Sequence, residues 1–327
     1  MSRWPYLFVA FFVAMLAMLD HGSAQTWKPT RNVEIIVGSA AGGGADITGR
    51  LMQKIFQDKL LTEVATSVVN KTGGGSALSY VYMNQHPGDG HYIALSLQPM
   101  ITGPLMIAGQ MSYTEMTPLA QLLNEYVGFA VRPESPIKSG RDLVERLRKD
   151  SASLSIGLST ALAGSNHLAT VLALKAAGVD VKRLRVVVVS GASESITAVM
   201  GGHIDVVASS AASLISFLQA GKLRGIAVSG PRRLADAYAD IPTWKEQGVD
   251  SVYANWRGVV GPKGMSAAQV AYWDVVLANL AQTPEWREGL VRLLQDPAYL
   301  NSRDTRRFLD SQHQELRAVL LDLGLAK

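Results

Sequence analysis

The chain of 327 residues contains no cysteine. This absence excludes disulfide bonds, thiolate metal ligands and a cysteine nucleophile. Charge is also sparse, since 18% of the residues are charged, the net charge is +4, and no five like charges follow one another. A nucleic-acid stripe or a polybasic membrane patch needs a denser cluster of Lys and Arg. We therefore expect no nucleic-acid partner.

Recognisable catalytic motifs are missing as well. The loop Gly42–Asp46 lacks the Lys-Ser/Thr of a nucleotide P-loop and does not match G-x-G-x-x-G. Segment Gly191–Ser195 lacks the final glycine of a nucleophile elbow, no H-E-x-x-H occurs, and the six histidines are scattered. We expect no enzyme, no cofactor and no metal. An enzyme on the same fold is an alternative that would require a nucleophile–base or metal constellation in a cleft.

The one long apolar run lies at the N-terminus. Leu7–Leu19 follows Arg3 and precedes Gly22-Ser23-Ala24, the small residues that a signal peptidase recognises. The run is shorter than the about 20 residues that a transmembrane helix needs. We predict that residues 1–24 are a cleaved export signal and that the mature protein works in the periplasm; an uncleaved anchor is the alternative.

The chain is organised around Val33–Asp46. Val33–Val37 is short, β-branched and almost wholly apolar, which predicts a strand buried on both faces. A glycine-rich loop follows, and an apolar helical stripe begins after Asp46. The free backbone N–H groups and the positive end of a helix dipole at such a junction bind small anions.

This arrangement recurs along the chain. Small-residue loops precede predicted helices at Ser39–Gly44, Gly73–Ser76, Gly164–Asn166 and Ser190–Ser193, within two β-α-β series. Ligands of doubly wound sheets bind at the carboxyl ends of the strands, where such loops lie. We predict two α/β lobes, residues 25–125 with 230–327 and residues 126–229, facing each other across a cleft. Its N–H donors and Ser, Thr and Asn side chains suit a small carboxylate.

Asp46 has three possible roles in this scheme. A carboxylate in the first helical turn opposes the helix dipole. It can also hold the preceding loop in place, and it can contact a ligand directly. The first two interpretations are preferred to the third.

Several short pieces, in this order and spacing, resemble one family over nearly the whole mature chain: Ile35–Asp46, Asn70–Gly74, Pro87–Tyr92, Gly164–Ala169, Gly201–Asp205, Ala220–Arg224 and Ile241-Pro242-Thr243. They are similar to the exported solute receptors of tripartite tricarboxylate transporters, the TctC or Bug family. The resemblance implies a type II periplasmic-binding fold with two lobes, closing by hinge bending, and a membrane permease as partner. We expect a monomer.

The resemblance also implies which residues bind the ligand. They are Ser39, Ala41, Gly42, Gly43, Gly44, Asp46, Gln98, Ser159, Thr160, Gly164, Ser165, Asn166, Ser190, Gly191 and Ser193. Asn255–Gly258 resembles the tricarboxylate branch, so a citrate-like di- or tricarboxylate is the expected ligand. Departures from the family pattern at Ser39–Ala41, Val188–Ala192 and Ser209 fall in the expected pocket. An extracytoplasmic carboxylate sensor that docks on a receptor kinase is the alternative function, and the adjacent genes would distinguish the two.

Overall fold

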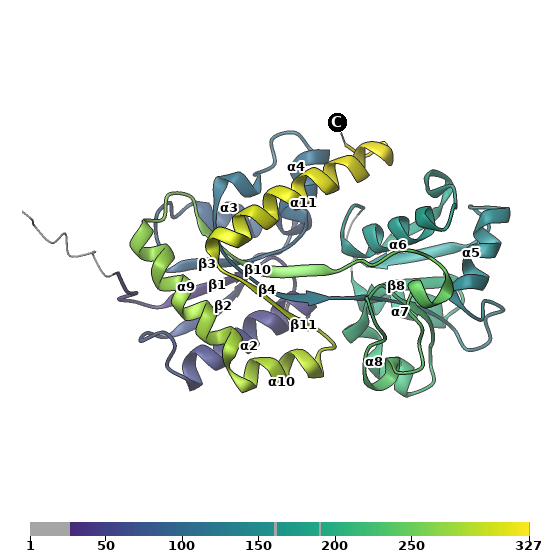
Figure 1. Cartoon of the computed structure of the whole chain (residues 1–327), viewed down its shortest axis with the longest axis horizontal. Helices are drawn as coiled ribbons and strands as arrows, with labels where there is room; N and C mark the ends of the chain where they lie inside the picture. Colours follow the sequence, from purple (N-terminus) through teal and green to yellow (C-terminus); the bar gives the residue numbers. More distant parts are fainter. Residues whose placement is uncertain (1–26, 160–161, 190, 327) are drawn as a thin grey trace, which may run out of the picture.

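A computed structural model describes residues 27–159, 162–189 and 191–326. Two mixed β-sheets, each flanked by helices, form two lobes that lie side by side (Figure 1). This confirms the predicted two-lobed α/β fold. The predicted signal, residues 1–24, lies outside the described residues. In the described part of the chain, no helix combines the length and apolarity needed to cross a bilayer.

The first lobe is built on a six-stranded sheet with the strand order β11-β4-β10-β3-β1-β2. β1 pairs in parallel with β2 and β3, whereas β10 pairs antiparallel with β3 and β4. The strands are β1 (Val33–Val37), β2 (Thr66–Asn70), β3 (Tyr92–Ser96), β4 (Met116–Glu125), β10 (Asn255–Pro262) and β11 (Asp296–Leu300). Its helices are α2 (Gly44–Asp58), α3 (Ala77–Asn84), α4 (Pro99–Met106), α9 (Ala267–Gln282), α10 (Pro284–Arg292) and α11 (Ser302–Asp322).

The second lobe is built on a five-stranded sheet with the order β7-β6-β8-β5-β9. β6 pairs in parallel with β7 and β8, and β5 pairs antiparallel with β8 and β9. The strands are β5 (Val127–Val131), β6 (Ser155–Ser159), β7 (Arg185–Val189), β8 (Val206–Ser210) and β9 (Arg224–Val228). The helices are α5 (Gly140–Lys149), α6 (Ser165–Ala176), α7 (Ala192–Met200) and α8 (Ala211–Gln219).

Local sequence signals account for several helix starts. The Ser139 hydroxyl accepts a hydrogen bond from the Asp142 N–H at the start of α5, as expected of an N-cap. Ser266 and Gln269 form a reciprocal capping box on α9. Pro284 occupies the first turn of α10, where its missing N–H costs nothing.

Two elements have weak local signals and are held by tertiary contacts. α4 contains Pro99, Gly103 and Pro104, which are poor helix formers, but Met100 and Ile101 are 1% exposed. β11 is an edge strand that pairs only with β4, and it contains Pro297, which edge strands tolerate. Neither element follows from periodicity alone.

The chain crosses between the lobes twice. Tyr126 is the single residue between β4 and β5, so Asn124-Glu125 continues a strand rather than interrupting one. Segment 230–254 packs on the five-stranded lobe: the Tyr238 hydroxyl donates to the Ala211 carbonyl at 3.1 Å, and the Trp244 ring lies 5.0 Å from the Phe129 ring. We therefore propose that the return crossing lies at residues 253–255.

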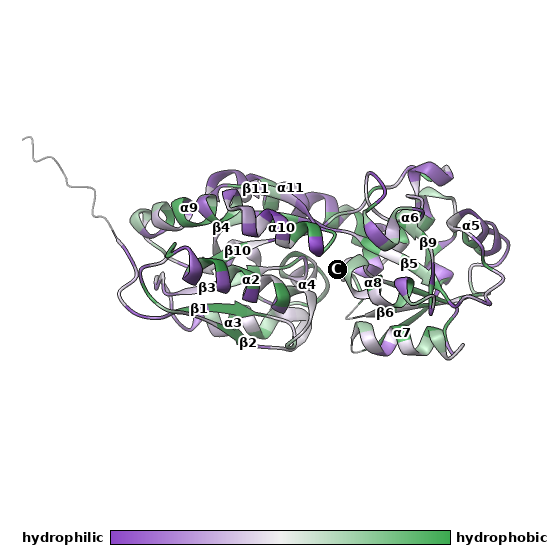
Figure 2. Cartoon of the chain, turned by 90° about the horizontal axis from the view of Figure 1, so that it is seen from below, coloured by the Kyte–Doolittle hydropathy of each residue, from purple (hydrophilic) through white to green (hydrophobic). Residues whose placement is uncertain are grey.

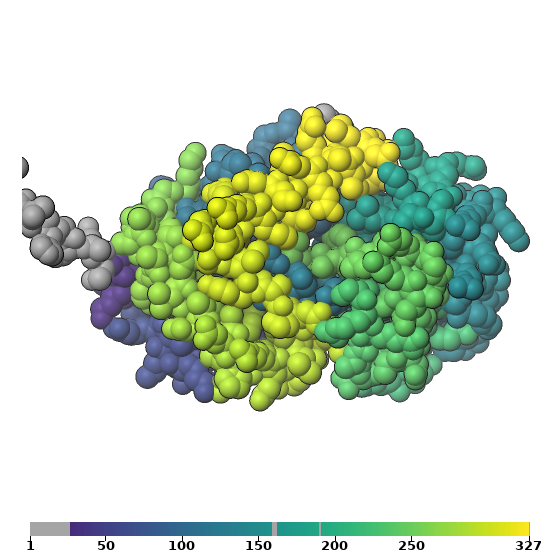
Figure 3. Space-filling view, in the orientation of Figure 1, coloured from purple at the N-terminus to yellow at the C-terminus, as the bar shows by residue number. Residues whose placement is uncertain are grey.

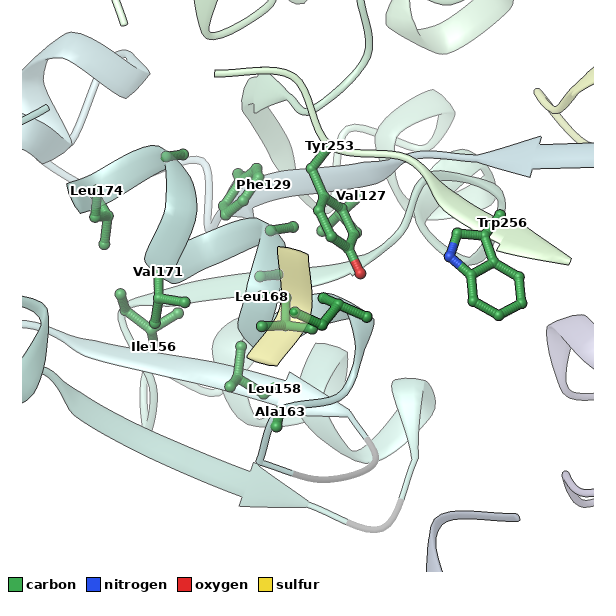
Figure 4. Close-up of a cluster of buried hydrophobic side chains, with 14 of the residues drawn as sticks. Val127, Phe129, Ile156, Leu158, Ala163, Leu168, Val171, Leu174, Tyr253 and Trp256 are labelled. Carbon is green, nitrogen blue, oxygen red and sulfur yellow. The ribbon is translucent and has the colours of Figure 1, made fainter. Parts of the chain in front are cut away.

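Apolar residues concentrate inside both lobes, between each sheet and its helices (Figure 2). One buried cluster continues from the five-stranded lobe to the hinge. Tyr253 lies between Val127 and Phe129 on one side and Trp256 on the other (Figure 4). The crossing between the lobes near Tyr253 is thus part of the core, and its side chains are held in defined positions.

Candidate ligand-binding site

The loop between β1 and α2 is held in shape by Asp46. This side chain is 1% exposed and accepts hydrogen bonds from the Gly42 N–H at 2.8 Å, Arg50 Nε at 2.8 Å and Asn70 Nδ2 at 2.9 Å. Asn70 Nδ2 also donates to the Ser39 carbonyl at 2.9 Å. One oxygen of Asp46 therefore holds Gly42 directly, and the other holds Asn70, which in turn holds Ser39; this is the loop-positioning role.

Burial by itself would raise the pKa of Asp46. The hydrogen bonds from Arg50, Gly42 and Asn70 outweigh that effect, and the pKa lies below its ordinary value. Asp46 is therefore a carboxylate whose acceptor sites are used within the protein. A second carboxylate would be repelled by it unless donors stood between them.

The glycines of the loop differ in what their N–H groups can do. The Gly42 N–H donates to Asp46, and the Gly43 N–H donates to the Ala40 carbonyl at 3.0 Å. Gly43 is the N-cap of α2, so Gly44 and Ala45 carry N–H groups that have no acceptor within the helix. An anion at this helix start would meet Gly44 and Ala45 rather than the earlier glycines.

A buried ion pair lies against the same helix start. Arg257 on β10 pairs through Nη2 with Glu125 at the end of β4, and the two side chains are 7% and 3% exposed. Arg257 Nη1 donates to the Thr48 hydroxyl at 3.1 Å, while its Nε is buried and has no hydrogen-bond partner among the described residues. A Cβ on Gly44 would lie 2.8 Å from Arg257 Nη2. The guanidinium therefore lies beside the N-terminus of α2, with its charge balanced by Glu125 and its Nε buried without a partner.

Polar side chains from both lobes meet next to this pair. The Ser165 hydroxyl on α6 lies 2.7 Å from Asn255 Oδ1 and 3.1 Å from Gln98 Oε1. The Asn255 amide donates to Glu125 at 2.9 Å, and the Ser210 hydroxyl donates to the other Glu125 oxygen. A continuous hydrogen-bonded chain thus joins the start of α6 and the end of β8 to the six-stranded lobe.

Tyr253 lies at one end of this hydrogen-bonded network. Its hydroxyl donates to Gln98 Oε1, and the ring is buried. Burial raises the pKa of Tyr253, so the hydroxyl stays protonated and remains a hydrogen-bond donor.

The predicted site residues fall into three groups. Gln98 and Ser165 are in direct contact, and Gly44 and Asp46 lie at the adjoining end of α2. Gly164 and Gly191 are the N-caps of α6 and α7, and Asn166 is in the first turn of α6. Ser39, Gly42 and Gly43 form the loop that Asp46 holds, whereas Ala41 is exposed and Ser193 lines a hollow on α7 with Thr197 and His203.

Three predicted residues allow no test of their side chains. Thr160 and Ser190 lie outside the described residues, and only the backbone of Ser159, the last residue of β6, is described. Conversely, the prediction omitted Glu125, Ser210, Tyr253 and Arg257. Two of them, Glu125 and Arg257, do have a sequence signal, because each is a charged residue inside an apolar strand, in LLNEYV and NWRGVV.

His167, in the first turn of α6, orders the loop before it. Its Nδ1 accepts the Ala163 N–H at 3.0 Å, and Ala163 has a positive φ of 57°. Burial lowers the pKa of His167 to about 4, so the ring is neutral at physiological pH and can accept this bond. Among the residues the structure describes, no group of three or more His, Asp or Glu is placed to hold a metal ion.

Two α/β lobes with the starts of α4 and α6 in contact between them are typical of a two-lobed solute-binding protein. The family model described as "Tripartite tricarboxylate transporter family receptor" matches residues 50–325. The chain therefore belongs to the tripartite tricarboxylate transporter receptors, the TctC family. Its relatives are substrate-binding receptors, and the chain is a receptor rather than an enzyme.

Individual relatives agree with this assignment. The UPF0065 protein in gbd 5'region of Cupriavidus necator is 27% identical over 91% of this chain and 89% of its own length. A solved structure described as "R. palustris Rpa4515 with adipate" is 22% identical, covers 91% of this chain and 99% of its own, and has a TM-score of 0.80. The solved structure of MatC from Rhodopseudomonas palustris with bound malate is 19% identical, covers 89% of this chain and 99% of its own, and has a TM-score of 0.75. The two structural likenesses show the fold.

Proposed function

We propose that this receptor captures a small di- or tricarboxylate in the periplasm and delivers it to the membrane permease of a tripartite transporter. The observation that carries the proposal is the buried Arg257 guanidinium beside the first free N–H groups of α2. A helix N-terminus contributes roughly half a positive charge. Arg257 and Glu125 cancel in net charge, so the positive end of α2 is the uncompensated charge that a ligand carboxylate would meet.

The remaining helix starts supply the second carboxylate contact. Ser165 begins α6, Gly191 caps α7 and Gln98 caps α4, and each follows a strand of the sheets. We infer that one ligand carboxylate lies at α2 and Arg257, and that the other is held by the second lobe. The adipate and malate bound by relatives of the same fold are dicarboxylates, which supports this class.

Isothermal titration calorimetry with malate, adipate, citrate and the monocarboxylate butyrate tests the proposal. We expect saturable binding of at least one di- or tricarboxylate and weaker binding of butyrate. If none of the panel binds, the proposed ligand class is wrong.

Variants at the ion pair test the position of the ligand. Arg257→Gln alone would leave Glu125 buried without its partner, which costs about 3–5 kcal/mol of stability. The double variant Arg257→Gln with Glu125→Gln replaces both charges by amides and avoids this problem. We expect it to fold and to lose about 10- to 100-fold in affinity, the value of a charge-assisted hydrogen bond. Arg292→Gln, on an exposed pair of α10, is the control and should bind normally.

A further inference from the structure

Helix α11 extends from its own lobe to the other one. It packs on β4 and α4 of the six-stranded lobe, and in its middle Gln312 accepts a hydrogen bond from Trp256 Nε1 at 3.1 Å. At its end, Asp322 accepts a hydrogen bond from Lys175 Nζ of α6 at 2.5 Å. The space-filling view shows α11, in yellow, reaching the second lobe (Figure 3). Because α6 belongs to the five-stranded lobe, this ion pair joins the two lobes.

The ion pair lies away from the crossing between the lobes. The Ser165 hydroxyl, at the start of α6, is 2.7 Å from Asn255 Oδ1 beside the crossing. At 1.5 Å per residue, α6 extends about 15 Å from Ser165 to Lys175, and α11 extends about 15 Å from Gln312 to Asp322. A rigid-body rotation of about 15° moves a point about 15 Å from its axis by about 4 Å. Movement of the lobes of this size would therefore break the contact.

A cavity lies between the two helices before they meet. Its volume is about 190 Å³, and its walls include Leu172 of α6 and, from α11, Phe308, Leu316 and Val319. Protein interiors are otherwise close-packed, so a space of this size means that apolar packing does not fix the separation of α6 and α11 there. The charged contact beyond the cavity is therefore free to hold or release the end of α11.

The C-terminal end of α11 meets positive charge that its own sequence does not supply. The carbonyl end of a helix carries roughly half a negative charge, which Lys or Arg in the last turn balances. The last turn of α11 contains no basic residue and ends at Asp322. The pKa of Asp322 lies below its ordinary value, chiefly because Lys175 donates a hydrogen bond to it, and Lys182 of the same lobe adds to the effect. The second lobe thus balances the negative end of this helix.

We propose that Asp322 and Lys175 form an electrostatic latch that holds α11 against the second lobe and favours this arrangement of the lobes before any ligand binds. The two side chains are 49% and 52% exposed, and exposed ion pairs change an equilibrium by up to about fivefold. A change of that size shifts the populations of two arrangements that are close in free energy. Salt screens exposed charges, so the latch opens as the ionic strength rises.

A distance measurement between the lobes tests the latch. The chain has no cysteine, so two introduced cysteines carry the only spin labels. Ala152→Cys in the second lobe and Gln314→Cys on α11 use exposed, uncharged positions, and double electron–electron resonance measures the distance between the labels. We expect this distance to lengthen from about 0.01 M to about 1 M sodium chloride, as the Debye length falls from about 30 Å to about 3 Å. A distance distribution that does not change with salt would overturn the proposal.

Variants of the labelled protein locate the effect. Asp322→Asn should lengthen the distance at low salt and remove its dependence on salt, and Lys175→Gln should do so to a smaller extent because Lys182 remains. The double variant should behave like Asp322→Asn, since both changes remove one contact. Lys54→Gln is the matched control, because Lys54 and Asp58 form an exposed pair within α2 alone, and it should behave like the parent. A parent-like distance at low salt in Asp322→Asn would refute the latch.

The effect of the latch on ligand binding rests on the proposed function. If the latched arrangement is the one that holds a carboxylate, Asp322→Asn should weaken binding by about two- to fivefold, although Asp322 lies outside the proposed carboxylate site. Calorimetry at low salt with the tightest-binding of malate, adipate and citrate measures this, and equal affinity would refute the coupling. If no carboxylate binds, the proposed function fails and the distances still decide the latch. If carboxylates bind and the distances do not respond, the latch alone fails.

Discussion

Three charged side chains of the candidate site, Arg257, Glu125 and Asp46, are buried. Arg257 and Glu125 are far from solvent, and Asp46 is 1% exposed. Such groups are stable only when hydrogen bonds and opposite charges compensate for lost hydration. Glu125 meets this requirement through Asn255, Ser210 and Arg257. Arg257 meets it in part, since its buried Nε has no partner among the described residues.

Asp46→Asn should weaken carboxylate binding at least about tenfold, because an amide cannot accept all three hydrogen bonds that shape the loop. The loss of stability should be about 1–3 kcal/mol. Calorimetry and thermal unfolding measure the two effects. Asp58→Asn is the control, since Asp58 lies exposed on the same helix and pairs only with Lys54. Unchanged affinity in Asp46→Asn would contradict the loop-positioning role.

His167 should make stability depend on pH. Its pKa is about 4 in the folded protein and about 6.5 in the unfolded chain, so the unfolded state takes up a proton first. The stabilisation is complete above about pH 6.5 and is lost as the pH falls towards 4, by up to about 3 kcal/mol. Denaturant unfolding at several pH values measures this slope.

Replacing the histidines separates this effect from other titrations. His167→Asn should flatten the pH dependence between 6.5 and 4, while His203→Asn, at an exposed position, should leave it intact. Equal slopes in the two variants would show that another group is responsible. Asp46 changes the free energy of unfolding only at a lower pH than His167, because its pKa in the folded protein is depressed.

At the scale of elements, the start of each helix decides what its N–H groups can contact. α2 begins at a glycine because the guanidinium of Arg257 occupies the space of a side chain there. α7 also begins after a glycine, Gly191, but a Cβ on it would meet no heavy atom within 4 Å. The two glycines therefore have different surroundings: Gly44, the first residue of α2, lies against a side chain, and Gly191, the N-cap of α7, does not.

This contrast gives a matched pair of variants. Gly44→Ala places a Cβ 2.8 Å from Arg257 Nη2 and should displace the guanidinium, weakening carboxylate binding about tenfold. Gly191→Ala keeps an extended backbone at φ −167° and should change neither folding nor affinity by much. Both variants retain the N–H group, so calorimetry isolates the effect of the added methyl. Normal binding by Gly44→Ala would show that Arg257 does not take part in carboxylate binding.

At the scale of the whole molecule, the two lobes are joined by two chain crossings and by side-chain contacts across the cleft. Ser165 contacts Gln98 and Asn255, and Ser210 donates to Glu125. Each such bond is worth only about 1 kcal/mol net, which is the range in which a hinge equilibrium remains responsive to a ligand.

Ser165→Ala should shift this equilibrium towards separated lobes. Small-angle X-ray scattering without added ligand should give a larger radius of gyration than the parent protein, and carboxylate affinity should fall about fivefold. Ser193→Ala, at an exposed position on α7, is the control and should scatter like the parent. An unchanged radius and affinity for Ser165→Ala would show that this contact does not hold the lobes together.

The sequence predicts the fold well because its signals are local. Buried apolar strands, small-residue loops and helical stripes follow one another within stretches of about 15 residues, and both β-α-β series were found from them. The helix caps at Ser139, Ser266 and Thr283 are local as well. Strand ends are less predictable: composition favours a strand at Ser153–Gly157, but the strand is Ser155–Ser159, because sheet pairing rather than composition sets where a strand stops.

Of the candidate site, the sequence alone predicts the loops that precede helices. Gly44 and Ser165 belong to such loops, so their positions follow from the chain order of strand, loop and helix, whereas Gln98 came from the family resemblance. Arg257 and Glu125 are 132 residues apart and meet because β10 lies beside β4 in the sheet. No local sequence pattern predicts that these two residues are in contact. The two-lobed fold thus follows from short-range periodicity and the family from the order of short motifs, whereas the charged pair of the candidate site depends on strand order, which brings distant side chains together only after folding.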